Sequence, residues 1–199
     1  MQQVGFGLVI LLLIFSSTGD SEGQSGEYIK VFSHDVSGGL WVDHEDVGSK
    51  NEGNPEAKLY SILNQLEDYR TKDGKFKFKL CYPELTWGKN GRNCNEWYQT
   101  SNPYTEPTIS GFEEIYLAFG RDTSLNHWGG LGKNIAGGPD YSTVIDDSPT
   151  HVNHFSDIGC KTYWPEGQIP GPRFMNDTDD YSYSKKYSGV TKVVLYVEP

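Results

Sequence analysis

Four residues that can bind zinc stand at equal intervals of three in the segment HVNHFSDIGC: His151, His154, Asp157 and Cys160. Each of these side chains is a common type of zinc ligand. On a helix, however, every step of three residues falls about 60° short of a full turn, so the four side chains would wind around the axis and could not share one site. A loop could gather them, but we favour a surface loop with a buried cysteine over a zinc site.

The acidic segment NDTDDY, residues 176 to 181, offers calcium the hard oxygen ligands that this ion prefers. The candidate ligands are Asp177, Asp179 and Asp180. The segment lacks the glycine and the closing glutamate of an EF-hand loop. A solvated acidic loop is the alternative, and we rank it first because runs of charge are usually hydrated. We expect no cofactor, with calcium as the one alternative.

The same segment holds an acceptor triplet for N-glycosylation, Asn176-Asp177-Thr178. A glycan on Asn176 would place this loop on the surface of an exported protein. The aspartate at the middle position makes the triplet a poorer acceptor.

A third candidate is the aromatic and polar segment CNEWYQTSNP, residues 94 to 103. Trp97, Tyr98, Gln99 and Asn102 could form a lectin-like platform, because a flat ring with amide hydrogen bonds suits the face of a sugar. The alternative is that Trp97 fills the core and the polar residues after it form a turn. We favour this second interpretation.

Common signatures of enzymes are missing from the sequence. It has no nucleophile elbow, phosphate-binding loop, HExxH motif or dinucleotide fingerprint. A Ser-His-Asp triad could still assemble from distant residues, since geometry and not spacing defines it. We therefore expect a non-enzymatic protein and keep a secreted hydrolase as the least favoured class.

The charge of the chain restricts its partners. The 199 residues include 17 Lys and Arg against 27 Asp and Glu, a net charge of -10. Between residues 140 and 180 there are eight acidic residues and two basic ones. Such a chain repels phosphate backbones, so a nucleic acid partner is not expected.

The first residues resemble an export signal. An apolar stretch from Val4 to Phe15 has the length of a signal-peptide core and is too short to span a bilayer. Small residues at Ser17 and Gly19 suit a signal peptidase. We expect a signal peptide over 1–19, a disordered leader over 20–26, and a single extracellular domain over 27–199, with no membrane attachment after cleavage.

Three cysteines in an exported chain predict one disulfide and one remaining thiol. We favour a bond between Cys81 and Cys94, because the segment between them is rich in Gly and Asn and resembles a loop whose ends can meet. A bond between Cys94 and Cys160 stays open as the alternative.

One amphipathic helix is predicted over 54–69. Asn54 can cap it, Pro55 suits its first turn, and leucines and an isoleucine recur along one face. The alternation KFKFKL over 75–80 predicts a strand with an outward row of lysines. We interpret that row as a solvated face or protected edge rather than as a site for polyanions.

Further strands are predicted from β-branched and aromatic runs, with a hairpin at the start of the domain. The fold class is therefore mainly β (α+β), an antiparallel sandwich-like domain with one amphipathic helix. The predicted strands besides 75–80 are 28–33, 40–42, 109–119 and 190–197.

The amino-acid sequences of three segments resemble those of a group of secreted proteins. NEWYQTSNP, GFEEIYLAFG and LYSILNQLEDYRTKDGKFKFKL are similar to segments in extracellular proteins of corals and other marine invertebrates, including skeletal organic matrix proteins. The resemblance covers Glu27 to Glu198 and implies an extracellular matrix beside calcium mineral. It transfers no functional residue. Acidic mineral proteins carry long Asp runs, whereas this chain has only pairs, which argues against direct templating of mineral.

Together these observations predict a secreted, non-enzymatic extracellular matrix or adhesion protein, with a role in biomineralization implied by the resemblance. Its expected partners are matrix proteins, glycans or a mineral surface. A lectin-like carbohydrate-binding module is the alternative.

Overall fold

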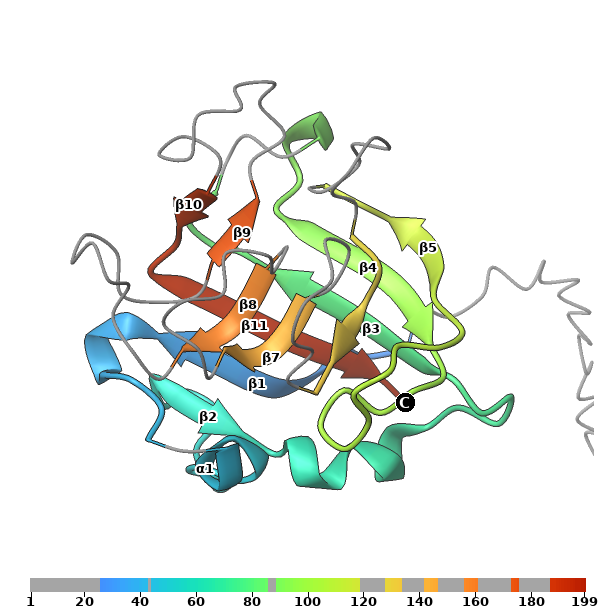
Figure 1. Ribbon diagram of the computed structural model, residues 1–199, viewed down its shortest axis with the longest axis horizontal. Helices are drawn as coiled ribbons and strands as arrows, with labels where there is room; N and C mark the ends of the chain where they lie inside the picture. The colour runs from blue at the N-terminus through green and yellow to red at the C-terminus, as the bar shows by residue number, and fades with distance from the viewer. Residues whose placement is uncertain are drawn as a thin grey trace, which may run out of the picture.

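A computed structural model gives the fold of the chain (Figure 1). It describes residues 26–42, 44–85, 89–118, 128–133, 142–146, 156–160, 173–175 and 187–199. Two β-sheets account for most of the regular structure in these ranges, together with short helical turns. The expectation of a mainly β domain is confirmed.

The larger sheet has six strands in the order β2-β1-β11-β3-β4-β5, and every neighbouring pair is antiparallel. The first and last of the described strands lie side by side near its centre. This pairing joins sequence-distant segments and explains why both carry β-branched and aromatic residues. The strands are β1 (Ile29–Asp35), β2 (Leu59–Ser61), β3 (Phe76–Cys81), β4 (Cys94–Gln99), β5 (Glu113–Tyr116) and β11 (Lys192–Glu198).

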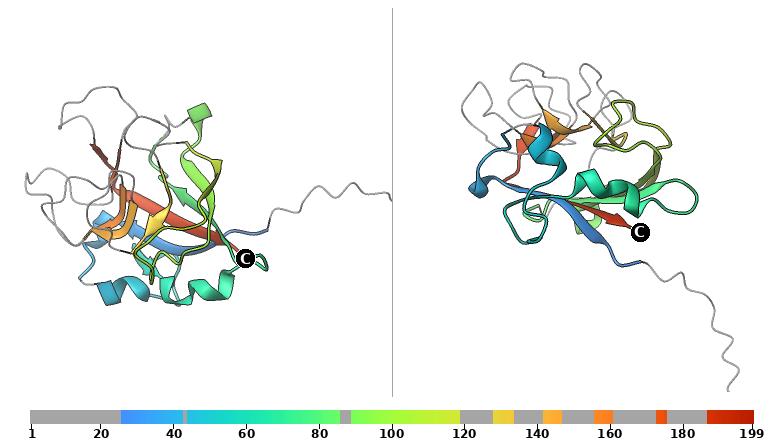
Figure 2. Two further views of the ribbon diagram at one scale, coloured as in Figure 1. Left: turned by 45° about the vertical axis from the view of Figure 1, so that its right-hand side comes forward. Right: turned by 90° about the horizontal axis from the view of Figure 1, so that it is seen from below.

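The smaller sheet lies over one face of the larger one, as the right-hand view of Figure 2 shows. Its order is β10-β9-β8-β7-β6, and the pairs β6–β7 and β7–β8 are parallel. The pairs β8–β9 and β9–β10 are antiparallel, so parallel pairing is confined to two of the nine strand pairs in the two sheets and the expectation of a mainly antiparallel domain holds. Its strands are β6 (Leu131–Gly132), β7 (Ser142–Asp146), β8 (Ser156–Cys160), β9 (Arg173–Met175) and β10 (Tyr187–Gly189).

The predicted amphipathic helix over 54–69 is wrong. Asn54 instead caps a turn, because its side-chain oxygen accepts from the amide of Glu56 at 3.3 Å. The chain then enters β2, which pairs with β1, and continues as a 3-10 helix, η2 (Leu63–Tyr69). The apolar spacing was real, since Leu63 and Leu66 are fully buried, but sheet pairing overrides helix formation at the start of the segment.

Other helical segments in the described ranges are short. They are α1 (His44–Gly48), η1 (Val36–Gly38) and η3 (Lys89–Gly91). No helix in these ranges is long and apolar enough to cross a membrane.

The predicted strand over 40–42 is also wrong, and with it the hairpin. Trp41 is buried and stacks on Phe32, with ring centroids 5.2 Å apart, whereas Val42 is 75% exposed. Both edges of β1 are already paired, with β11 and β2, so no edge is left for a strand here. The strands over 28–33, 75–80 and 190–197 are confirmed as β1, β3 and β11, and 109–119 contains the shorter β5.

The core fills the space between the two sheets. Phe32, Phe78 and Leu195 of the larger sheet are fully buried, as are Val144 and Ile158 of the smaller one. Gly159 in β8 permits this close approach, since an added Cβ would lie 3.1 Å from both Phe32 and Trp41. The opposite face of the larger sheet carries no described strand or helix (Figure 2).

Candidate functional site

Strand β4 divides the segment CNEWYQ between the two faces of the larger sheet. Asn95, Trp97 and Gln99 are buried, whereas Cys94, Glu96 and Tyr98 are half-buried. Side chains alternate along a strand, so the first set points toward the smaller sheet and the second toward the opposite face. One set of side chains in the segment therefore belongs to the core, and the other set to the opposite face of the sheet.

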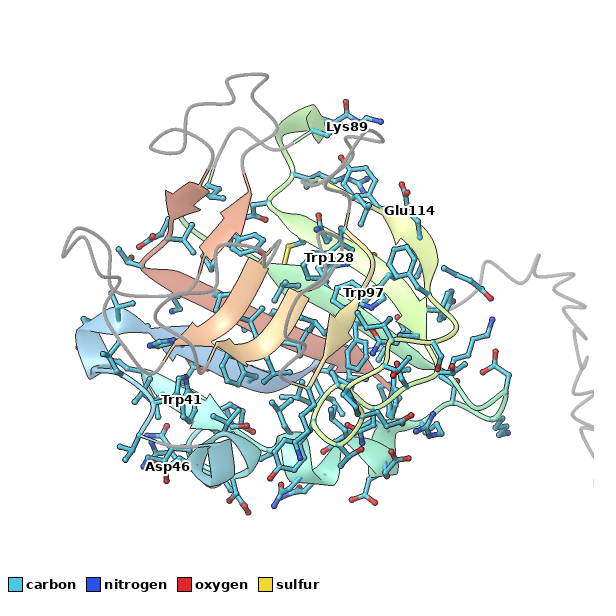
Figure 3. All side chains as sticks on the ribbon, viewed as in Figure 1. Trp41, Asp46, Lys89, Trp97, Glu114 and Trp128 are labelled. Atoms are coloured by element: carbon cyan, nitrogen blue, oxygen red, sulfur yellow. A yellow bond between two sulfur atoms is a disulfide. The ribbon has the colours of Figure 1, made fainter. Side chains whose placement is uncertain are left out.

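Trp97 is a core residue. Its ring lies 5.4 Å from that of Phe78 and 5.0 Å from that of Trp128, between centroids, and it has no exposed surface. Figure 3 shows Trp97 and Trp128 next to each other within the molecule. The indole N–H donates to the side chain of Gln99 at 3.1 Å, which satisfies the polar atom of this buried ring.

Gln99 connects the two sheets through its amide group. Its Oε1 accepts from Trp97 and from the amide of Leu131 at 3.0 Å, while its Nε2 donates to the carbonyls of Ser101 at 2.8 Å and Leu131 at 2.7 Å. All four hydrogen-bonding positions of the amide are used. Trp97 and Gln99 have no surface to offer a sugar, so the predicted platform is wrong for these two residues.

Asn102 shapes the turn that follows β4. Its Oδ1 accepts from the amide of Tyr104 at 2.9 Å, and its Nδ2 donates to Glu67 at 2.7 Å. Glu67 in turn forms an ion pair with Arg70 at 2.8 Å. Asn102 is 3% exposed, and these contacts agree with the interpretation of the polar residues as a turn.

The half-buried face of the larger sheet carries an ordered array of charged and aromatic side chains. Residues that stand opposite each other in neighbouring strands share a face. One row runs from β1 to β5 and a second from β11 to β5, and we call the two rows the outer ladder. The first row is Lys30, Tyr196, Lys79, Glu96 and Tyr116, and the second is Glu198, Lys77, Tyr98 and Glu113.

Ion pairs join the strands across the outer ladder. Lys77 pairs with Glu198, and Lys79 pairs with Glu96 at 3.4 Å. These four side chains are only 14% to 31% exposed, so the predicted row of lysines is not freely solvated. Surface pairs of this kind contribute only about 0.2–1 kcal/mol each. Their main effect is to hold the lysines and glutamates in fixed positions.

Tyr28 lies across the outer ladder just before β1. Its ring centroid is 4.9 Å from Nζ of Lys79 and 5.7 Å from Nζ of Lys77, and its hydroxyl donates to Glu96 at 3.4 Å. Burial, together with the nearby carboxylates of Glu96 and Glu198, raises the pKa of Tyr28 well above its ordinary value. The phenol therefore stays protonated and donates a hydrogen bond to Glu96.

The disulfide predicted between Cys81 and Cys94 is confirmed, and it adjoins the outer ladder. The two residues stand opposite each other in β3 and β4, with Cα atoms 4.1 Å apart. Because Cys81 follows Lys79 by two residues, and Cys94 precedes Glu96 by two, the bond lies on the same face as those side chains. It ties together the two strands that contribute Lys77, Lys79 and Tyr98.

The residues predicted to bind metal are mostly outside the described part of the chain. This applies to Asp177, Asp179 and Asp180, to the glycosylation candidate Asn176, and to the two histidines of the zinc hypothesis. Asp157 and Cys160 lie in β8. Among the residues that the structure describes, no group of three or more His, Cys, Asp or Glu side chains could hold a metal ion.

Tyr28, Tyr196 and Glu198 were not singled out in the sequence. A signal existed, because β3, β4 and β11 each contain two charged or tyrosine residues that stand two positions apart. What joins these positions into one surface is the strand order and register, which no single segment contains.

Comparisons with protein-family models, with curated proteins and with solved structures found no match.

Proposed function

We propose that this chain is a secreted, non-enzymatic extracellular matrix or adhesion protein that attaches to its partner through the outer ladder. The observation that carries the proposal is the ladder itself. It presents two ordered rows of Lys, Glu and Tyr on a sheet face that no described strand or helix covers. Tyrosine is enriched in surfaces that bind other proteins.

An extracellular location is supported by the disulfide between Cys81 and Cys94, because such bonds persist in oxidising compartments and are rare in the cytosol. The signal-peptide pattern over 1–19 and the resemblance to secreted matrix proteins point the same way. A matrix setting also suits a net charge of -10, which favours bound cations.

The proposed calcium ligands are Asp177, Asp179 and Asp180. Their oxygens would hold calcium in the matrix or contact a carbonate surface. This contribution is separate from the outer ladder, so the two can be tested with different variants.

The test begins with expression of the full chain in cultured animal cells. We expect a processed, disulfide-bonded protein in the medium that binds insoluble extracellular matrix or calcium carbonate in the presence of calcium. Changing the three aspartates to asparagine should weaken calcium-dependent binding, and unchanged binding would remove the calcium site. An unprocessed chain in the cytosol with all three thiols reduced would contradict the whole proposal.

A further inference from the structure

The two tyrosines at the centre of the outer ladder are spaced for an extended ligand. Tyr196 is in β11 and Tyr98 is in β4, with β3 between them. Two interstrand steps span about 10 Å, and the two residues also differ by one row, which adds about 7 Å along the strands. The rings are therefore roughly 12 Å apart, a span that suits several linked units better than one small molecule.

Both tyrosines keep part of their surface exposed. Tyr98 and Tyr196 are half-buried and lie on the face opposite the core. Tyr98 is further held by Lys75, whose Nζ is 5.7 Å from its ring centroid. Tyrosine has few rotatable bonds, so a ring on a strand loses little conformational freedom when it stacks against a ligand.

The charges of this face are paired with one another, which favours an uncharged ligand. Four of its lysines have a carboxylate partner: Lys30 pairs with Glu56, Lys75 with Glu113, Lys77 with Glu198, and Lys79 with Glu96. No lysine of this set is left to attract a polyanion, and the net charge of -10 repels one at a distance. Sulfated and phosphorylated chains are thereby disfavoured.

The fixed ion pairs also supply hydrogen-bonding groups at short intervals. An ammonium group can donate and a carboxylate can accept, so a Lys–Glu pair can engage neighbouring hydroxyl groups of a sugar. The pairs hold these groups in place before the ligand arrives, which reduces the entropy lost on binding.

We propose that the outer ladder binds a neutral polysaccharide that lies across the strands, with sugar rings stacked on Tyr98 and Tyr196. Its hydroxyl groups bond to the Lys75–Glu113 pair beside Tyr98, because Tyr28 already covers Lys79 and Glu96. This inference rests on the proposed function, because it uses the same surface, and it adds the chemical class of the ligand. It also moves the carbohydrate site from the buried Trp97 to the opposite face of β4.

The test is isothermal titration of the secreted, oxidised protein with neutral hexasaccharides of glucose, N-acetylglucosamine, xylose and mannose, and with heparin as a charged comparison. We expect binding to at least one neutral hexasaccharide and none to heparin. Tyr98→Ala and Tyr196→Ala should each weaken binding about threefold to tenfold, the loss of one stacked ring.

Two controls separate loss of the ring from loss of the fold. Tyr98→Phe keeps the ring and should bind within about twofold of the natural protein, since stacking needs only the ring face. Val42→Ala changes a side chain that is 75% exposed and outside the outer ladder, and it should leave binding unchanged. Thermal unfolding of every variant shows whether the domain is folded.

Three results would overturn the inference. They are no binding to any neutral hexasaccharide at millimolar concentration, binding that the Tyr98→Ala and Tyr196→Ala changes do not affect, and binding to heparin alone. If matrix attachment depends on Tyr98 while no hexasaccharide binds, the ligand class is wrong and the proposed function stands. A dimer that forms through the two tyrosines would assign the face to a second copy of the chain and overturn the glycan inference.

Discussion

Removing the Cys81–Cys94 disulfide is the perturbation whose effect the structure allows us to calculate most directly. The two residues are separated by 13 positions in the sequence, and the bond closes that segment into a loop. Restricting the unfolded chain in this way is worth about 3 kcal/mol for a loop of this length. In the folded state β3 and β4 are also held by their sheet pairing, so the native arrangement should survive without the bond.

We therefore expect the double variant Cys81→Ala/Cys94→Ala to fold with a free energy of unfolding lower by about 3 kcal/mol. In a domain of this size the melting temperature should fall by roughly 6–12 °C. Urea unfolding followed by tryptophan fluorescence measures the first quantity, and calorimetry measures the second. The natural protein in the presence of a reductant serves as the matched control and should behave like the variant.

A loss below about 1 kcal/mol would refute this reasoning, because it would show that the closed loop does not restrict the unfolded chain. Thiol titration of the denatured, unreduced protein supplies an independent check. It should detect one thiol among the three cysteines, and peptide mapping should find Cys81 bonded to Cys94.

Three further outcomes are expected. Trp97→Ala should cost about 3–5 kcal/mol of stability because it empties the space beside Phe78 and Trp128, whereas Tyr98→Ala should cost less than about 1.5 kcal/mol; similar losses in urea unfolding would contradict the assignment of the two faces. Gly130→Ala should cost more than about 1 kcal/mol in the same assay, because Gly130 has a φ of +101° and an added Cβ would lie 2.6 Å from Oε1 of Gln99; an unchanged midpoint would argue against this contact. Burial lowers the pKa of His34 below its ordinary value of 6.5, so the unfolded chain takes up a proton first and stability should fall as the pH drops below about 6.5; unfolding measured between pH 7.5 and 5.5 should show a smaller loss for His34→Gln, and an identical pH dependence would show that His34 does not contribute.

Two strands and the disulfide could be predicted from patterns within single short segments of the sequence. The alternation in 75–80 identified β3, and the β-branched run in 190–197 identified β11. The Gly- and Asn-rich segment between Cys81 and Cys94 indicated the disulfide. The helix over 54–69 failed because β2 is fixed by pairing with β1, a contact that its own residues do not encode.

The candidate site was harder to predict from the sequence, because it also depends on contacts between strands that are distant in the chain. Trp97 and Tyr98 are neighbours in the chain, and only the direction of β4 relative to the core decides which of them is buried. The lectin-like alternative placed both on one platform, whereas the favoured interpretation placed Trp97 in the core. The strand sends the two residues to opposite faces, with Trp97 fully buried. The pairing of Lys77 with Glu198 joins residues 121 positions apart, and this contact follows from the strand order alone.

Chemical footprinting of lysines tests the central claim, attachment through the outer ladder, most directly. The secreted protein would be acetylated while free and while bound to insoluble extracellular matrix, and each site quantified by mass spectrometry. Lys50, which pairs with Asp46 away from the ladder at 3.4 Å, is the matched internal control. The account predicts that acetylation of Lys77 and Lys79 falls severalfold on binding while that of Lys50 is unchanged. Unprotected Lys77 and Lys79 in the bound protein would contradict it.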